Sequence, residues 1–72
     1  MSSLIDKPTG FCGPIQALEG DAVLVERLYE IGLTPHEWVK IKQKMVLQGP
    51  LIIGFRQATF ALRREEAQCI KV

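Results

Sequence analysis

The side chains that could support catalysis are few in this sequence, and they do not form a recognisable constellation. The single histidine, His36, stands in a loop beside Pro35, and the two cysteines, Cys12 and Cys69, lie near opposite ends of the chain. A nucleophilic cysteine needs a base within hydrogen-bonding reach and a further group that orients the base, and no spacing here suggests that arrangement. Phosphate-binding loops of the GxxxxGK(S/T) and GxGxxG types are absent as well. The sequence therefore predicts a protein that is not an enzyme, and no catalytic residue is assigned.

A metal centre is also poorly supported by the sequence. Structural zinc sites usually take about four Cys or His ligands at short paired spacings, whereas this chain has two Cys and one His in total. Carboxylates such as Glu37 or Asp21, or a second copy of the chain, would have to complete any such site. We therefore expect no metal site and no cofactor, and two free thiols in a reducing cytoplasm. Strand parity places both Cys12 and Cys69 outside the predicted core.

A basic stripe with an aromatic residue is the clearest candidate binding feature. Lys40, Lys42 and Lys44 share one face of a predicted strand with Trp38. Such a stripe suits single-stranded nucleic acid or an acidic partner, although lysines on the solvent face of an edge strand also discourage aggregation. Trp38 is more informative, because Trp is enriched at interface hot spots. The alternative is that its ring packs against the neighbouring loop or the end of a helix.

Candidate partner-binding residues follow from this stripe and from one further basic pair. We predict that Trp38, with Glu37 and Lys40 beside it, lies in the surface that contacts a partner protein, because loops carry function more often than the walls of a barrel do. The turn at Arg63 and Arg64 is the next candidate.

One helix is expected among the elements that hold these residues. Asp21 is a suitable N-cap, and Leu24, Leu28 and Ile31 recur at the i, i+4, i+7 spacing of one helix face. Gly32 supplies the left-handed residue that commonly ends a helix. These signals predict a helix over about residues 21–31 that buries its apolar stripe across the core.

Much of the remaining chain alternates between apolar and polar residues, at the period of two that is typical of strands. Pro14 cannot donate a ladder hydrogen bond, which puts the first strand at an edge of its sheet. A hairpin turn is expected at Arg56–Gln57, and one helical turn over residues 63–67. The predicted strands cover residues 11–18, 38–42, 51–55, 60–62 and 70–72. About five short strands and one helix predict a mainly β fold, in the form of a small closed or half-closed barrel.

Composition is consistent with a single small domain. The chain has 72 residues, a net charge of +1, 47% hydrophobic residues and 24% charged residues, so neither disorder nor the binding of bulk DNA is indicated. We expect one domain over residues 1–72, with residues 1–9 as an N-terminal arm. No signal peptide is recognisable, and no window approaches the roughly 20 apolar residues of a membrane span. A cytoplasmic location, without direct insertion into a membrane, is the expectation.

Motifs from both halves of the chain occur in the order and at the separation of one known family. They are Leu18-Glu19-Gly20, Arg27-Leu28 and Ile31-Gly32-Leu33-Thr34-Pro35, then Gly49-Pro50-Leu51, Phe60-Ala61-Leu62-Arg63-Arg64-Glu65-Glu66-Ala67, Ile70 and Val72. From about Pro8 to Val72, the chain resembles the FeoA family, the small partner proteins of ferrous iron transport.

The resemblance implies an SH3-like β-barrel with one helix between its first two strands. It also implies an accessory or regulatory role in ferrous iron uptake, at the inner face of the membrane, through docking on FeoB, a permease with a cytoplasmic GTPase domain. Weak self-association is left open, and no nucleic acid is implied as a partner. The same fold occurs at the C-terminus of iron-dependent repressors of the DtxR type, so a metal-sensing regulatory domain is the alternative function. A small nucleic-acid-binding barrel that uses Trp38 and the lysines is a third, which the low net charge disfavours.

Two positions depart from the pattern of this family. The family usually has Gly where this chain has His36 and Gln57. If the backbone stays left-handed at both positions, each residue that is not glycine costs about 1–2 kcal/mol.

Overall fold

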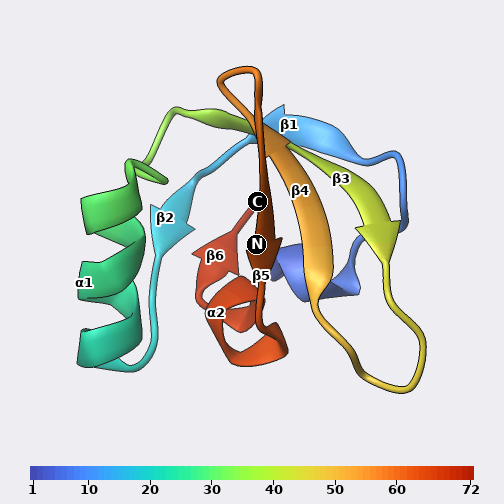
Figure 1. Cartoon of the computed structure of the whole chain (residues 1–72). Helices are drawn as coiled ribbons and strands as arrows, with labels where there is room; N and C mark the ends of the chain where they lie inside the picture. The colour runs from blue at the N-terminus through green and yellow to red at the C-terminus, as the bar shows by residue number, and fades with distance from the viewer.

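The computed structural model describes residues 1–72 and confirms a mainly β fold. Its elements in chain order are η1 (Leu4–Asp6), β1 (Cys12–Pro14), β2 (Ala17–Leu18), α1 (Ala22–Ile31), β3 (Trp38–Lys44), β4 (Leu51–Phe55), β5 (Ala58–Leu62), α2 (Arg64–Gln68) and β6 (Ile70–Lys71). Four antiparallel strands form one sheet in the order β1-β3-β4-β5, and β2 pairs with β6 in a second sheet of two strands. Figure 1 shows α1 at one side of the molecule beside β2, with the β4–β5 turn at one end and α2 towards the other.

The predicted first strand is divided into two short strands, which belong to different sheets. The hydrogen-bond partners change at Ile15 and Gln16. The Ile15 N–H donates to the Glu37 carbonyl (2.7 Å), whereas the Gln16 N–H donates to the Lys71 carbonyl (2.7 Å). The chain therefore passes from the four-stranded sheet to the two-stranded sheet at this point. This division raises the number of strands to six, and α1 follows the second of them.

Helix α1 begins and ends where its sequence signals predict. The Asp21 carboxylate accepts hydrogen bonds from the N–H groups of Val23 (2.9 Å) and Leu24 (3.1 Å), which satisfies donors that have no partner inside the helix. Gly32 ends the helix with a φ of 102°, a left-handed conformation that favours glycine. Leu28 is completely buried at the centre of the apolar stripe.

The core is one cluster of 14 buried side chains, and it receives residues from both sheets. Strand β4 shows the expected alternation, because Leu51, Ile53 and Phe55 are buried while the residues between them are not. The N-terminal arm is part of this core, since Leu4 and Ile5 of η1 are buried as well. Burial of these two side chains fixes the start of the chain against the rest of the domain.

The expectation that Lys44 shares a face with Trp38 is wrong. The register between β3 and β4 shifts at Lys42, which is the extra residue of a β-bulge. A single extra residue reverses the parity of everything after it. Lys44 is therefore half-buried, and its amine donates to the carbonyls of Ile5 (2.8 Å) and Lys7 (2.9 Å). The basic stripe on the outer face is shorter than the sequence pattern indicates.

The expectation that Cys69 lies outside the core is also wrong. Only 4% of Cys69 is exposed, and it belongs to the core cluster. Its backbone (φ −80°, ψ −16°) is still helical at the end of α2, so parity counted along a strand does not apply to it. The Cys69 thiol donates to the Glu65 carbonyl at 3.4 Å. Cys12 is exposed, as predicted, and both residues are free thiols.

Candidate protein-binding surface

A groove crosses the outer face of the four-stranded sheet, and it contains part of the predicted partner-binding surface. This sheet groove has a volume of about 270 Å³. Trp38, Lys40 and Lys42 of β3 line it together with Gly54 of β4 and the turn at Arg56–Gln57. The groove is open to solvent and has both apolar and basic walls, a composition that suits a protein surface better than a small molecule.

A glycine forms the floor of the sheet groove. Residue pairing places Cys12, Lys40, Gly54 and Thr59 side by side across the strands. A Cβ atom at Gly54 would lie 2.8 Å from the Lys42 Cε atom, so the lysine side chain lies directly over this glycine and would have to shift if a larger residue stood there. The Lys42 amine donates to the Thr59 hydroxyl at 2.8 Å. This hydrogen bond holds the positive charge over the outer face of the sheet.

A charged hydrogen-bonded pair fixes the loop before β3 to the β4–β5 turn. The Arg56 Nε and Nη2 atoms donate to the two carboxylate oxygens of Glu37 at 3.1 and 2.6 Å. These hydrogen bonds hold the pKa of Glu37 below its usual value, and the same bonds raise the pKa of Arg56. The guanidinium also lies 5.2 Å from the centre of the Phe55 ring. Glu37 is thereby held next to Trp38 in a defined geometry.

Trp38 lies beside this pair with most of its surface in solvent. It is 60% exposed, whereas the next residue, Val39, is 1% exposed. The alternation predicted for this strand is therefore confirmed, and the ring does not enter the core. In the register of the sheet, Trp38 is paired with Pro14 of the edge strand β1. A large aromatic ring left this accessible is typical of an interface residue.

Both positions where the family usually has glycine keep a left-handed backbone. The φ angle is 80° at His36 and 64° at Gln57, and Arg56 has a φ of 50°. Positive φ at both central residues defines the type I′ turn of a two-residue hairpin, which confirms the predicted turn. Arg56, which holds Glu37, is therefore one of the two turn residues with an unfavourable left-handed backbone.

Arg63 and Arg64, the other predicted site residues, lie at the opposite end of β5. They line a separate hollow of about 380 Å³ together with the loop at Gln48–Pro50. Because β5 runs from the hairpin turn to Arg63, its length separates the two groups. The structure brings Glu37, Trp38 and Lys40 together and leaves the arginine pair apart from them.

Nothing in the sequence marks Arg56 as a residue of the candidate site. Glu37 and Arg56 are 19 positions apart and belong to different elements, so no periodicity could have connected them. The hairpin turn was predicted, but its proximity to the loop before β3 depends on the whole sheet.

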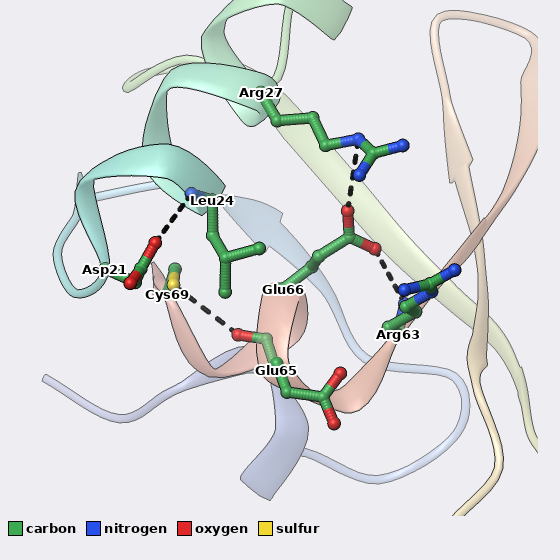
Figure 2. Close-up of polar contacts among 7 residues, drawn as sticks. All are labelled: Asp21, Leu24, Arg27, Arg63, Glu65, Glu66 and Cys69. Atoms are coloured by element: carbon green, nitrogen blue, oxygen red, sulfur yellow. Dashed lines mark hydrogen bonds and ion pairs between the residues drawn. The ribbon is translucent and has the colours of Figure 1, made fainter.

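A second ion pair lies at the junction of the two helices (Figure 2). Glu66 of α2 is 7% exposed, and one of its carboxylate oxygens accepts a hydrogen bond from the Arg63 N–H at 2.9 Å. The other oxygen lies 3.8 Å from the Arg27 Nε atom of α1. This carboxylate both caps α2 and connects the two helices.

Two further observations concern ligands and membranes. No group of three or more His, Cys, Asp or Glu side chains is arranged to hold a metal ion. Neither helix has the length and apolar character needed to cross a bilayer.

Comparison with known proteins decides the family. The sequence model of the FeoA domain matches residues 3–72. The chain belongs to the FeoA family. None of the curated proteins matches its sequence.

Solved structures agree with this membership. An iron uptake regulatory protein, FeoA, is 25% identical with a TM-score of 0.82, and the match covers 96% of this chain and 89% of that one. A FeoA of Stenotrophomonas maltophilia complexed with zinc, described as a prokaryotic SH3 domain protein, is 23% identical with a TM-score of 0.81, covering 97% and 87%. A manganese-dependent transcriptional repressor is 19% identical with a TM-score of 0.85, covering 94% of this chain and 38% of the repressor.

These likenesses confirm the SH3-like fold and associate the chain with ferrous iron transport through its family. The repressor shares the fold alone, because its identity to this chain is low.

Proposed function

We propose that this FeoA-family chain is an accessory protein of ferrous iron uptake that acts in the cytoplasm, at the inner face of the membrane, and docks on a FeoB-like permease through the GTPase-bearing domain of that permease. The observation that carries the proposal is the exposed Trp38 ring beside the sheet groove. The chain contributes a binding surface and no catalytic residue of its own. Family membership supports a role in ferrous iron uptake. The geometry of the sheet groove supports docking through the surface around Trp38.

The charges around Trp38 indicate what the partner surface contains. Glu37 is already matched by Arg56, whereas Lys40 makes no ion pair and Lys42 donates only to the Thr59 hydroxyl. The unmatched charge of the groove is therefore positive. A partner that places an apolar pocket over Trp38 and carboxylates over the two lysines would be complementary to it.

A binding titration with the cytoplasmic domain of the FeoB-like permease tests this proposal. Replacing Trp38 by Ala should weaken binding by about 2 kcal/mol or more, on the order of thirtyfold, because a hot-spot aromatic ring is removed. Tyr29→Ala is the matched control, since Tyr29 is an exposed aromatic residue on α1 (49% exposed) and lies outside the groove. Tyr29→Ala should leave the affinity unchanged.

Three results would contradict the proposal. The first is that the wild-type chain fails to bind the permease domain. The second is that Trp38→Ala, with an unchanged melting profile, binds as tightly as the wild type, in which case the arginine pair Arg63–Arg64 becomes the next candidate. The third is that Trp38→Ala unfolds the chain, which would make the ring a structural residue.

A metal-sensing regulatory domain is the second candidate function, because transcriptional repressors that depend on manganese share this fold. In that case, adding Fe²⁺ or Mn²⁺ should change the affinity for the partner at a fixed stoichiometry of metal to chain. The proposed docking function predicts the same affinity with metal and with a chelator.

A further inference from the structure

The two edge strands of the four-stranded sheet differ in how well they are protected against pairing with a strand of another chain. Strand β1, at one edge, is three residues long and ends in Pro14, two features that block pairing with another chain. Strand β5, at the other edge, has five uncharged residues without proline. Its pairing with β4 continues without a bulge from Phe55–Ala58 to Leu51–Leu62. Strand β5 is therefore the unprotected edge.

Backbone groups with no partner in the sheet point outward from β5. In an antiparallel hairpin with a two-residue turn, the pair next to the turn exchanges hydrogen bonds and every second pair does the same. Ala58, Phe60 and Leu62 therefore bond to β4, while the N–H and C=O groups of Thr59 and Ala61 point away from it. Thr59 and Ala61 are exposed, and neither takes part in the backbone hydrogen bonds outside the helices and strands.

We propose that the β5 edge binds an extended peptide segment of a partner protein, which adds an antiparallel strand to the sheet and carries acidic residues before an uncharged centre. The Thr59 and Ala61 groups supply the hydrogen bonds of such a strand addition. The Thr59 hydroxyl adjoins the sheet groove through Lys42, but the outward backbone groups of β5 face away from β4 and from the strand that carries Trp38. Binding at this edge does not depend on the proposed function.

Charge at the C-terminal end of β5 determines the acidic part of the peptide. Arg63 and Arg64 follow the strand directly, and neither has a carboxylate within ion-pair distance. The nearest acidic residues in sequence do not neutralise them, because Glu66 is paired with Arg27 and Glu65 makes no ion pair. In an antiparallel arrangement, the N-terminal end of the peptide lies beside these arginines. Acidic residues are therefore complementary at that end.

The same charges disfavour a second copy of the chain as the occupant. Two β5 strands paired antiparallel about Phe60 would place Arg63 opposite the uncharged Gln57 and Arg64 opposite Arg56, whose charge Glu37 already matches. Neither Arg63 nor Arg64 would gain a carboxylate partner in such a pair. The edge is therefore better matched to an acidic segment than to itself.

A titration with synthetic peptides, followed by the backbone amide signals of the isotope-labelled chain, tests this proposal. The probe is acetyl-Asp-Glu-Val-Thr-Val-Thr-Gly-amide, and its control carries the same residues in reverse order. We expect the largest shifts at the amides of Thr59 and Ala61. Binding of the reversed peptide should be weaker by about threefold or more, because its acidic end exchanges the two unpaired arginines for Arg56, which Glu37 already neutralises, and for the single charge of Lys42 at Thr59.

Two further peptides test strand addition without any change to the protein. They are methylated at the amide nitrogens of alternate central residues, either at the even positions or at the odd positions. Because only alternate N–H groups of a strand face its neighbour, one peptide should lose binding and the other should retain it. The variant Ala61→Pro removes an outward N–H group and should weaken binding by about fivefold or more, the loss expected for ~1 kcal/mol, whereas Ala61→Ser should not.

Several outcomes would overturn the proposal. These are the absence of binding, equal binding of the two methylated peptides, shifts centred on Trp38, and shifts at Thr59 and Ala61 that depend on the concentration of the chain alone. The last would show that a second copy occupies the edge.

Discussion

The two ion pairs of this protein lie at opposite ends of the molecule and differ in what surrounds them. Arg56 and Glu37 form the closer contact, at 2.6 Å, but their side chains are 66% and 27% exposed. Arg27 and Glu66 are 3.8 Å apart, and the Glu66 side chain is only 9% exposed. The shorter distance does not indicate the greater contribution to stability, because exposed pairs are screened by water.

The two regions should therefore respond differently to substitution. Around Glu37 the charged groups orient a loop and the exposed ring beside it, so substitutions there should change binding more than folding. Around Glu66 the carboxylate caps one helix and joins it to another, so substitutions there should change folding.

The largest effect is expected beneath the helix junction. Leu28→Ala should lower the free energy of unfolding by about 2–5 kcal/mol, because it empties space in the core of a small domain. Val23→Ala is the control on the same helix, since Val23 is 74% exposed, and its effect should be within about 0.5 kcal/mol. Urea unfolding of both variants measures the difference. Equal stabilities would contradict the assignment of the buried face of α1.

Glu66→Ala should cost about 1–3 kcal/mol, because the N–H of Arg63 loses its acceptor at the start of α2. Glu66→Gln retains an acceptor oxygen and removes the charge, so it should lie between Ala and the wild type. Chemical unfolding of the three chains gives the order. If Glu66→Gln were as unstable as Glu66→Ala, the ion pair with Arg27 would dominate and the role of Glu66 as a cap would be secondary.

Gln57→Gly should stabilise the fold by about 1 kcal/mol, because glycine adopts the left-handed backbone of this turn without strain. Gln57→Ala, which keeps a Cβ atom, should give no gain. Thermal melts of the pair test the turn, and a loss of stability in Gln57→Gly would show that the Gln57 side chain has a role that its φ of 64° does not reveal.

The smallest expected effect is on the ionisation of Glu37. Its folded-state pKa lies below the usual 4.5, so the stabilisation from the pair is present above that pH and is lost as the pH falls through the folded-state pKa. Arg56→Gln should return the pKa of Glu37 towards 4.5. Lys40→Gln is the control, because Lys40 makes no ion pair with Glu37. Carboxyl NMR titrations measure the values, and an unchanged pKa in Arg56→Gln would assign the shift to another cause.

Local signals predicted local structure well. The cap at Asp21, the stop at Gly32 and the two-residue turn at Arg56–Gln57 depend on residues near one another, and all three are confirmed. The outward position of Trp38 also followed, because the bulge in β3 lies after Ile41 and leaves the alternation from Trp38 to Ile41 intact.

The two wrong predictions concern structural features that an apolar–polar alternation with a period of two does not reveal. One extra residue at Lys42 turns Lys44 inward, and the helical turn that reaches Cys69 buries its thiol. The contact between Glu37 and Arg56 required the complete sheet. The sequence thus predicted Glu37, Trp38 and Lys40 on one surface, but not Arg56, which holds Glu37 in place.

The most direct test of the account is the environment of Trp38 in the complex. Because this is the only Trp of the chain, labelling with 5-fluorotryptophan gives one fluorine NMR signal from the chain. We predict that saturating amounts of the cytoplasmic domain of the FeoB-like permease shift and broaden this signal, since the ring passes from solvent into the interface. A signal that stays at its free position, while sedimentation shows that the complex has formed, would contradict the assignment of Trp38 to the docking surface.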